Sequence, residues 1–120
     1  MRLIVLSDDR VIAEDAALIA RDAAPTAEAV IVASMAEAAA LIEAPAAPTA
    51  ILMVEPRRDL HDHPIALAAR ARGMWLVVIS EDARSFDGGD DTKLLGVQVP
   101  FTADSLGTVI SRIVRDRPQG

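Results

Sequence analysis

The stretch AILMVEPRRD, residues 50–59, runs from a short apolar segment directly into a carboxylate. Residues 50–54 have the length and composition of a strand that is buried on both faces, as in a parallel sheet. In an open α/β sheet, ligands bind at the carboxyl ends of the strands, where the last residue of a strand faces the crevice above the sheet. Glu55 is therefore the first candidate for a functional site.

The composition fits one domain with an aliphatic core. The chain has 120 residues, 52% of them hydrophobic and 2% aromatic, so Ala, Val, Ile and Leu supply the core. It contains no cysteine, which excludes disulfides and thiolate metal sites. A net charge of −6 argues against a nucleic-acid partner. No apolar run approaches about 18 residues, and we expect a cytoplasmic protein without membrane contact.

Strands and helices alternate along the chain. Short apolar runs predict five strands, at 3–6, 28–33, 50–54, 74–79 and 96–99. Caps and apolar spacing predict helices at 10–24, 34–43 and 64–72, a weak helix near 90–95, and a last helix that begins at Thr102. In the first helix, the stripe expected to face the sheet is Ile12, Ala16, Ile19 and Ala23.

This alternation predicts an α/β fold of the flavodoxin-like type. We expect a doubly wound, five-stranded parallel sheet with strand order 2-1-3-4-5, helices on both faces and a short or irregular fourth helix. Residues 1–116 are expected to form this domain, and 117–120 a tail or linker. The switch point then lies between the first and third strands, so Asp8 and Asp9 should gather near Glu55.

With these residues placed, the chain resembles the receiver domain of two-component response regulators over essentially its whole length. The loop LSDDR at 6–10 resembles the family's metal-binding acidic pair, and Glu55 stands where the family has its phosphorylated aspartate. Ser80, which ends VVIS, stands at the switch Thr or Ser. The segment VPFTADSL at 99–106 resembles the family's KPF segment, which enters the last helix.

The same resemblance exposes departures at the phosphorylation site. The acidic pair maps onto Ser7 and Asp8, with Asp9 beside them, so a hydroxyl replaces one carboxylate. The phosphoacceptor position holds Glu55, and Val99 replaces the lysine before Pro-Phe. The family neutralises the phosphoryl charge with a divalent cation and that lysine. We therefore expect a pseudo-receiver without the usual aspartyl-phosphate cycle, in which Asp8 is only a weak metal ligand and no cofactor is required, Mg²⁺ being doubtful.

Two arginines lie near the crevice in sequence. Arg10 follows the acidic loop, and Arg57 lies two positions beyond Glu55. Without a metal, carboxylates that converge on one crevice repel each other. We expect an arginine guanidinium to occupy the place of the family's metal and to pair with Glu55 or Asp8; the alternative is that both arginines point into solvent.

Two other polar segments invite a metal interpretation. His61 and His63 could supply two ligands, but a loop gives them no fixed geometry, and ordinary loop polarity is the better interpretation. Asp87, Asp90 and Asp91 surround two glycines, yet they lack the spacing of a calcium loop. We therefore predict a flexible acidic loop there.

The resemblance implies a signalling module rather than an enzyme. Its expected partners are a histidine kinase, a phosphotransferase or an effector domain, and a homodimer is a further expectation. The first and last helices are the expected docking surface, because Gly88 and Gly89 weaken the fourth helix. Two alternatives stay open: a receiver that accepts phosphate at an aspartate such as Asp8 or Asp9, and a flavodoxin-like sensor of small ligands.

Overall fold

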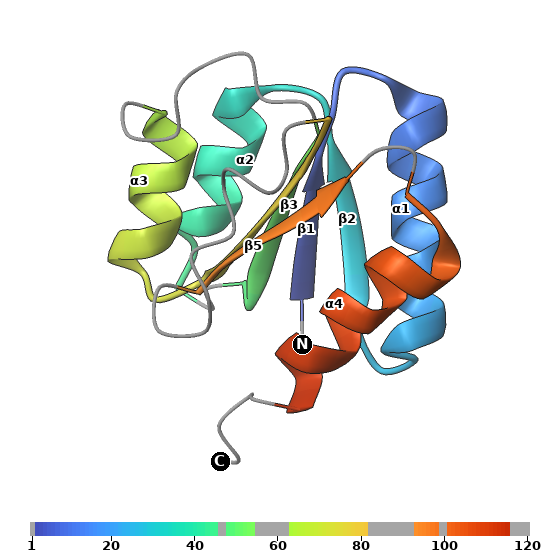
Figure 1. Ribbon diagram of the computed structural model, residues 1–120. Helices are drawn as coiled ribbons and strands as arrows, with labels where there is room; N and C mark the ends of the chain where they lie inside the picture. Colours follow the sequence, from blue (N-terminus) through green and yellow to red (C-terminus); the bar gives the residue numbers. More distant parts are fainter. Residues whose placement is uncertain (1, 46–47, 55–62, 82–92, 99–100, 116–120) are drawn as a thin grey trace.

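The structure is a computed structural model that describes residues 2–45, 48–54, 63–81, 93–98 and 101–115. Five parallel strands form one sheet in the order β2-β1-β3-β4-β5, so the predicted flavodoxin-like topology is confirmed (Figure 1). The strands are β1 (Arg2–Leu6), β2 (Glu28–Val32), β3 (Ala50–Val54), β4 (Trp75–Ser80) and β5 (Leu94–Gln98).

Helices cover both faces of the sheet (Figure 1). In the described part of the chain they are α1 (Arg10–Ala23), α2 (Met35–Ile42), α3 (Pro64–Ala71) and α4 (Ala103–Arg115). The pair α1 and α4 packs on one face, and the pair α2 and α3 packs on the other. None of these helices has the length and apolar character needed to cross a membrane.

Polar side chains fix where the helices begin. The Ser34 hydroxyl accepts the N–H of Glu37 at 3.2 Å, so Ser34 is the N-cap of α2. Thr102 likewise accepts the N–H of Ser105 at 3.0 Å and starts α4. At the other end of α3, Gly73 has a φ of 70°, the left-handed conformation that commonly ends a helix. The predicted starts of α2 and α4 and the predicted stop of α3 are therefore confirmed.

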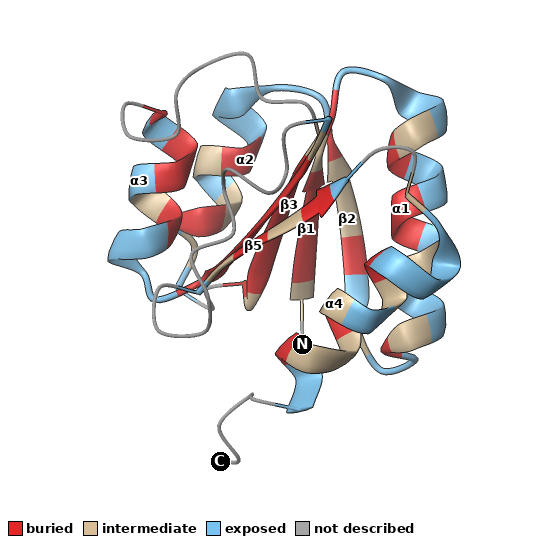
Figure 2. Ribbon diagram, viewed as in Figure 1, coloured by how far each residue is buried: buried red, intermediate tan, exposed pale blue. Residues whose placement is uncertain are grey.

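The core is divided into two layers by the sheet, because successive strand residues point to opposite faces. Leu3 and Val5 pack under α1 and α4, whereas Ile4 packs under α2 and α3. Figure 2 shows buried residues running along the central strands, as expected where helices cover both faces. The strands therefore carry continuous apolar runs.

The last strand differs from its predicted bounds. β5 begins at Leu94 rather than Gly96, so Leu94 and Leu95, predicted to end a weak helix, are strand residues. The register explains the early start: Leu76 of β4 lies opposite Leu94, and the Leu76 N–H donates to the carbonyl of Lys93 at 2.8 Å. The rest of the predicted weak helix lies outside the described residues.

Candidate functional site

The backbone segments that carry the predicted site residues meet at the carboxyl edge of the sheet. β1 and β3 are neighbours, with Leu6 opposite Met53, so the loop that begins at Ser7 leaves the sheet beside the end of β3. In β4, Ile79 lies opposite Val54, which places Ser80 at the same edge. Glu55, Arg57 and Val99 lie outside the described residues, and their roles remain predictions.

Ser7 fixes the loop after β1. Its side chain is buried, with 6% of the residue exposed. The hydroxyl oxygen accepts the N–H of Asp9 at 3.0 Å and lies 3.1 Å from the carbonyl of Asp9, to which it donates. The N–H of Ser7 donates to the carbonyl of Val32 at 3.1 Å. The hydroxyl therefore closes a local turn and is directed to the backbone.

Asp9 is the N-cap of α1. One carboxylate oxygen accepts the N–H of Val11 at 3.0 Å and that of Ile12 at 3.3 Å. These N–H groups would otherwise lack a partner at the start of the helix, and the helix dipole favours a negative charge there. Asp9 thus has a structural role, while its neighbour Asp8 is exposed at the same edge.

Arg10 does not occupy the crevice, which corrects one expectation from the sequence. Its Nε donates to a carboxylate oxygen of Glu14 at 3.0 Å, and 84% of its side chain is exposed. The reason is helical geometry, since residues four apart lie on the same side of a helix. Of the two arginine candidates, only Arg57 remains a candidate for the family's metal position.

The described residues also limit a metal interpretation. Within the ranges that the structure describes, no three His, Asp or Glu side chains are grouped so that they could hold a metal ion. Whether Asp8 binds magnesium together with residues beyond Val54 stays a prediction.

His63 has a structural role that the sequence interpretation missed. It is only 5% exposed, and its Nδ1 accepts the N–H of Ile65 at 3.2 Å, so the imidazole caps α3. Pro64 occupies the first turn, where its missing N–H costs nothing. A side-chain acceptor immediately before a first-turn proline was the available signal for this cap.

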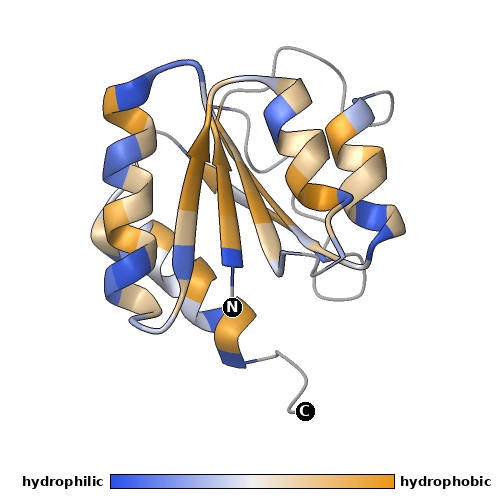
Figure 3. Ribbon diagram, turned by 180° about the vertical axis from the view of Figure 1, so that it is seen from behind, coloured by the Kyte–Doolittle hydropathy of each residue, from blue (hydrophilic) through white to orange (hydrophobic). Residues whose placement is uncertain are grey.

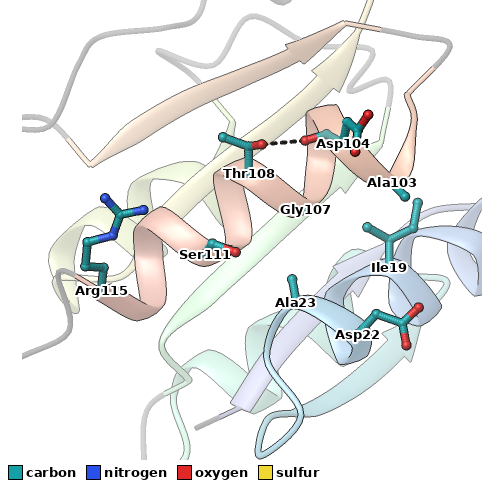
Figure 4. A pocket seen from close by; sticks show the side chains of 9 residues that line it. All are labelled: Ile19, Asp22, Ala23, Ala103, Asp104, Gly107, Thr108, Ser111 and Arg115. Carbon is teal, nitrogen blue, oxygen red and sulfur yellow. Dashed lines mark hydrogen bonds between the residues drawn. The ribbon is translucent and has the colours of Figure 1, made fainter.

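A groove of about 410 Å³ lies between α1 and α4 (Figure 4). Ile19 and Ala23 of α1 and Gly107 of α4 give it apolar walls, and Thr108 donates from its hydroxyl to the carbonyl of Asp104 at 2.6 Å. Its polar lining further includes Asp22, Ser111 and Arg115. The groove thus combines small apolar residues with both signs of charge.

Comparison with known proteins shows the fold. No protein-family model matches the chain, and no curated protein matches it in sequence. A response regulator receiver protein from Sinorhizobium medicae WSM419 superposes with a TM-score of 0.75 at 20% identity, over 98% of this chain and 97% of that one. The BeF3-activated form of SdrG from Pseudomonas melonis Fr1 gives 0.66 at 21% identity, over 94% and 95%.

The same fold occurs in a structure assigned to the pilus assembly protein CpaE from Burkholderia thailandensis E264. There the TM-score is 0.62 at 14% identity, over 97% of this chain and 99% of that one. These matches cover nearly the whole of each chain and agree with the strand order described above. The chain therefore has the flavodoxin-like fold of response-regulator receiver domains.

Proposed function

We propose that this chain is an atypical receiver module that signals through protein contacts, without an aspartyl-phosphate cycle and without enzymatic activity of its own. The observation that carries the proposal is the state of the loop after β1. The Ser7 hydroxyl is bonded to the backbone of Asp9, and the Asp9 carboxylate is bonded to the start of α1. Two of the three predicted acidic-pocket residues therefore have structural roles.

The chemistry of phosphoryl transfer supports the same proposal. Transfer to a carboxylate depends on positioning and on cations that neutralise the phosphoryl oxygens. Ser7 supplies no negative charge for a metal, and Val99 supplies no ammonium group. Glu55 carries one methylene more than aspartate, and a misplacement of about 1 Å can cost roughly a hundredfold in rate. In our proposal Arg57 supplies the positive charge in place of a metal, and Ser80 retains the switch position.

The proposed partner is a signalling protein, such as a histidine kinase, a phosphotransferase or an effector domain. The α1/α4 face is our candidate for its docking surface. Val11 and Leu18 of α1 are 73% and 56% exposed, beside the charged residues Glu14 and Asp15. Exposed apolar residues that are framed by charges are typical of a surface that binds another protein.

Phosphorylation chemistry provides the test. The chain is incubated with Mg²⁺ and acetyl phosphate, or with beryllofluoride, and followed by intact mass and by amide NMR. We expect no labile adduct and no shift of the crevice amides. Formation of an acyl phosphate in near-stoichiometric yield would contradict the proposal.

A restored variant is the matched control. Ser7→Asp, Glu55→Asp and Val99→Lys together reintroduce the family's acidic pair, acceptor and lysine. We expect this triple variant to bind Mg²⁺ and to respond to beryllofluoride, whereas the natural chain does neither. If both proteins respond equally, the departures at these three positions are not what decides the chemistry.

A small-ligand sensor is the second candidate, favoured by the groove between α1 and α4. Its volume of about 410 Å³ falls in the range of ligand pockets. A ligand that binds only the folded chain raises its melting temperature in proportion to the logarithm of ligand concentration. A thermal-shift screen with small charged metabolites separates the two candidates, because a protein-docking module shows no such response.

A further inference from the structure

The outer sides of α2 and α3 carry very little charge. α2 has the sequence MAEAAALI and α3 has PIALAARA, so Glu37 and Arg70 are their only charged residues. α1, by contrast, contains Arg10, Arg21 and three acidic residues. Figure 3 shows this difference, with hydrophilic positions spread along α1 and few on the opposite pair of helices.

Apolar side chains lie exposed on this weakly charged surface. Leu67 of α3 is 51% exposed and Met35 of α2 is 40% exposed. Ala36, Ala40 and Ala71 are exposed as well. We call these five residues the α2/α3 face. The inner sides of the same two helices are also apolar, since Ile42 of α2 and Ile65 of α3 are buried in the core beneath them.

Of the four charges on α2, on α3 and on the described residues that close these helices, three lie at one end. The carboxyl ends of α2 and α3 lie side by side, because Arg72 donates from its guanidinium to the carbonyl of Ala44 at 3.1 Å. Glu43 closes α2 with a negative charge, and Arg70 and Arg72 close α3 with positive charge; all three are exposed. Met35 and Glu37 lie in the first turn of α2, and Leu67 lies at the middle of α3. The face therefore has opposite charges side by side at its carboxyl-terminal end, and Glu37 is the one charge in the rest of it.

We propose that the α2/α3 face binds a second copy of this chain about a two-fold axis parallel to the two helices. This axis places α2 on α3 of the partner subunit, with both helices running in the same direction. Glu43 then meets Arg70 and Arg72 of the partner subunit, and Met35 lies near the partner's Leu67. Two-fold interfaces are self-complementary in this way, and the charge pairs are satisfied twice.

A two-fold axis perpendicular to the helices fits less well. It would place α2 against α2 and α3 against α3 in opposite directions. Arg70 and Arg72 would then lie against the start of the partner's α3, which holds Pro64 and Ile65. Glu43 would lie against the start of the partner's α2, which holds the like charge of Glu37. Charges buried against apolar groups lose hydration without gaining a partner. The charge pattern therefore selects the parallel arrangement.

The size of the face sets the expected affinity. Each helix has eight residues and is therefore about 12 Å long. Such a patch is smaller than the roughly 800 Å² per partner of a standard stable interface. We expect a reversible dimer that forms at micromolar to millimolar concentrations. This inference does not depend on the chemistry of the crevice, so it can fail while the proposed function stands.

Analytical ultracentrifugation of the full chain across a concentration series tests the dimer. The natural chain should show a concentration-dependent monomer–dimer equilibrium. Leu67→Glu should raise the dissociation constant at least tenfold, because it introduces two charges among the apolar residues of the interface. The matched control is Leu18→Glu, a comparably exposed leucine at 56% on α1, which should leave the equilibrium unchanged. Circular dichroism verifies that both variants are folded.

A charge exchange tests the orientation. Glu43→Arg should weaken the dimer about fivefold, as expected for two exposed ion pairs of roughly 0.5 kcal/mol each. Adding Arg70→Glu and Arg72→Glu to this variant should restore most of the affinity. A chain that stays monomeric at millimolar concentration overturns the proposal. A dimer that Leu18→Glu disrupts and Leu67→Glu does not would overturn it equally, because the interface would then lie on α1.

Discussion

The two helical layers of this chain are alike on their inner sides and different on their outer sides. Under α1 and α4, and under α2 and α3, the sheet presents the same kind of aliphatic surface. Outside, α1 and α4 carry charges of both signs and a groove, whereas α2 and α3 carry mainly alanine with Met35 and Leu67 exposed. Core packing therefore determines the fold but leaves the exposed residues of the helices free to vary. The two helical layers can for this reason bind different partners.

The difference in charge also has a physical consequence for binding. A surface of mixed charges selects its partner by complementary charges, and its association slows as salt screens them. A surface with fewer charges depends more on apolar contact and responds less to salt. Raising the salt concentration should therefore weaken a complex on the α1/α4 face more than a dimer on the α2/α3 face.

The largest expected effect on stability comes from core substitutions, which test whether the two helical layers are packed alike on their inner sides. Ile110 of α4 and Ile42 of α2 are both fully buried, one in each layer. Replacing either with alanine removes buried methyl and methylene groups and leaves a cavity, so Ile110→Ala and Ile42→Ala should each lower the free energy of unfolding by about 3 kcal/mol. Urea denaturation followed by circular dichroism measures both values.

Val114→Ala is the control for this pair, since Val114 of α4 is 38% exposed. It should cost well under about 1 kcal/mol, as is usual for a partly exposed surface residue. If Ile42→Ala cost no more than Val114→Ala, the layer under α2 and α3 would not be packed as described, and the comparison of the two layers would fail.

An intermediate effect concerns one helix start in each layer. Asp9 caps α1 and His63 caps α3. Asp9→Ala should cost about 1 kcal/mol, because the N–H groups of Val11 and Ile12 lose their acceptor. His63→Ala should cost about 2 kcal/mol, since it also removes a buried imidazole. The readout is again the free energy of unfolding in urea.

Conservative replacements distinguish the capping role of Asp9 and His63 from the other contributions of these side chains. Asp9→Asn retains an N-cap acceptor and should change stability by only a few tenths of a kcal/mol. His63→Asn retains an acceptor but loses the volume of the ring, so it should fall between the natural chain and His63→Ala. An Asp9→Ala variant as stable as the natural chain would show that the cap is not needed, and would return Asp9 to the list of candidate site residues.

The sequence predicts the strands well, because burial on both faces gives continuous apolar runs. β3 has its predicted bounds, Ala50–Val54. The sequence pattern predicts the start of β5 two residues late, because Gly96 interrupts its apolar run and the preceding segment is rich in glycine and aspartate. Its true start depends on pairing with β4, which is a long-range interaction that local composition does not encode.

Helix α1 shows a second limit of sequence patterns. Isoleucine is more hydrophobic than alanine, so Ile12 and Ile19 were expected to face the sheet. In the structure the fully covered positions are alanines, including Ala13 and Ala20, and Ile19 is only partly buried. Small side chains allow the helix to lie close to the sheet, while Ile19 lines the groove beside α4.

For the candidate site, the sequence correctly predicts the edge of the sheet where the site lies. It predicts the roles of the individual residues there less well. The order of the strands follows from the alternation of elements, and it brings the loop after β1 beside the end of β3. The partners of Ser7 and Asp9 depend on the conformation of a three-residue loop, and that of Arg10 on the helix that follows. Such local hydrogen bonds are decided by geometry within about one ångström, which residue types alone do not supply.

The smallest expected effect is a gain in stability on the α1/α4 side. Gly107 lies in α4 at the groove, and a methyl group added there would lie 3.9 Å from Cγ2 of Ile19, an ordinary contact. Because glycine inside a helix costs about 0.5–1 kcal/mol relative to alanine, Gly107→Ala should raise the free energy of unfolding by roughly 0.5 kcal/mol. Thermal and urea denaturation both measure this change.

The same variant distinguishes the two outer faces. The added methyl group occupies space in the groove, so a partner that inserts between α1 and α4 should bind Gly107→Ala more weakly although the domain is more stable. Self-association through the α2/α3 face should be unchanged, since Gly107 lies on the other side of the sheet. A loss of stability would mean that α1 and α4 lie closer than described; a weaker dimer would mean that the copies meet at the groove, and the division of roles between the two layers would then have to be reversed.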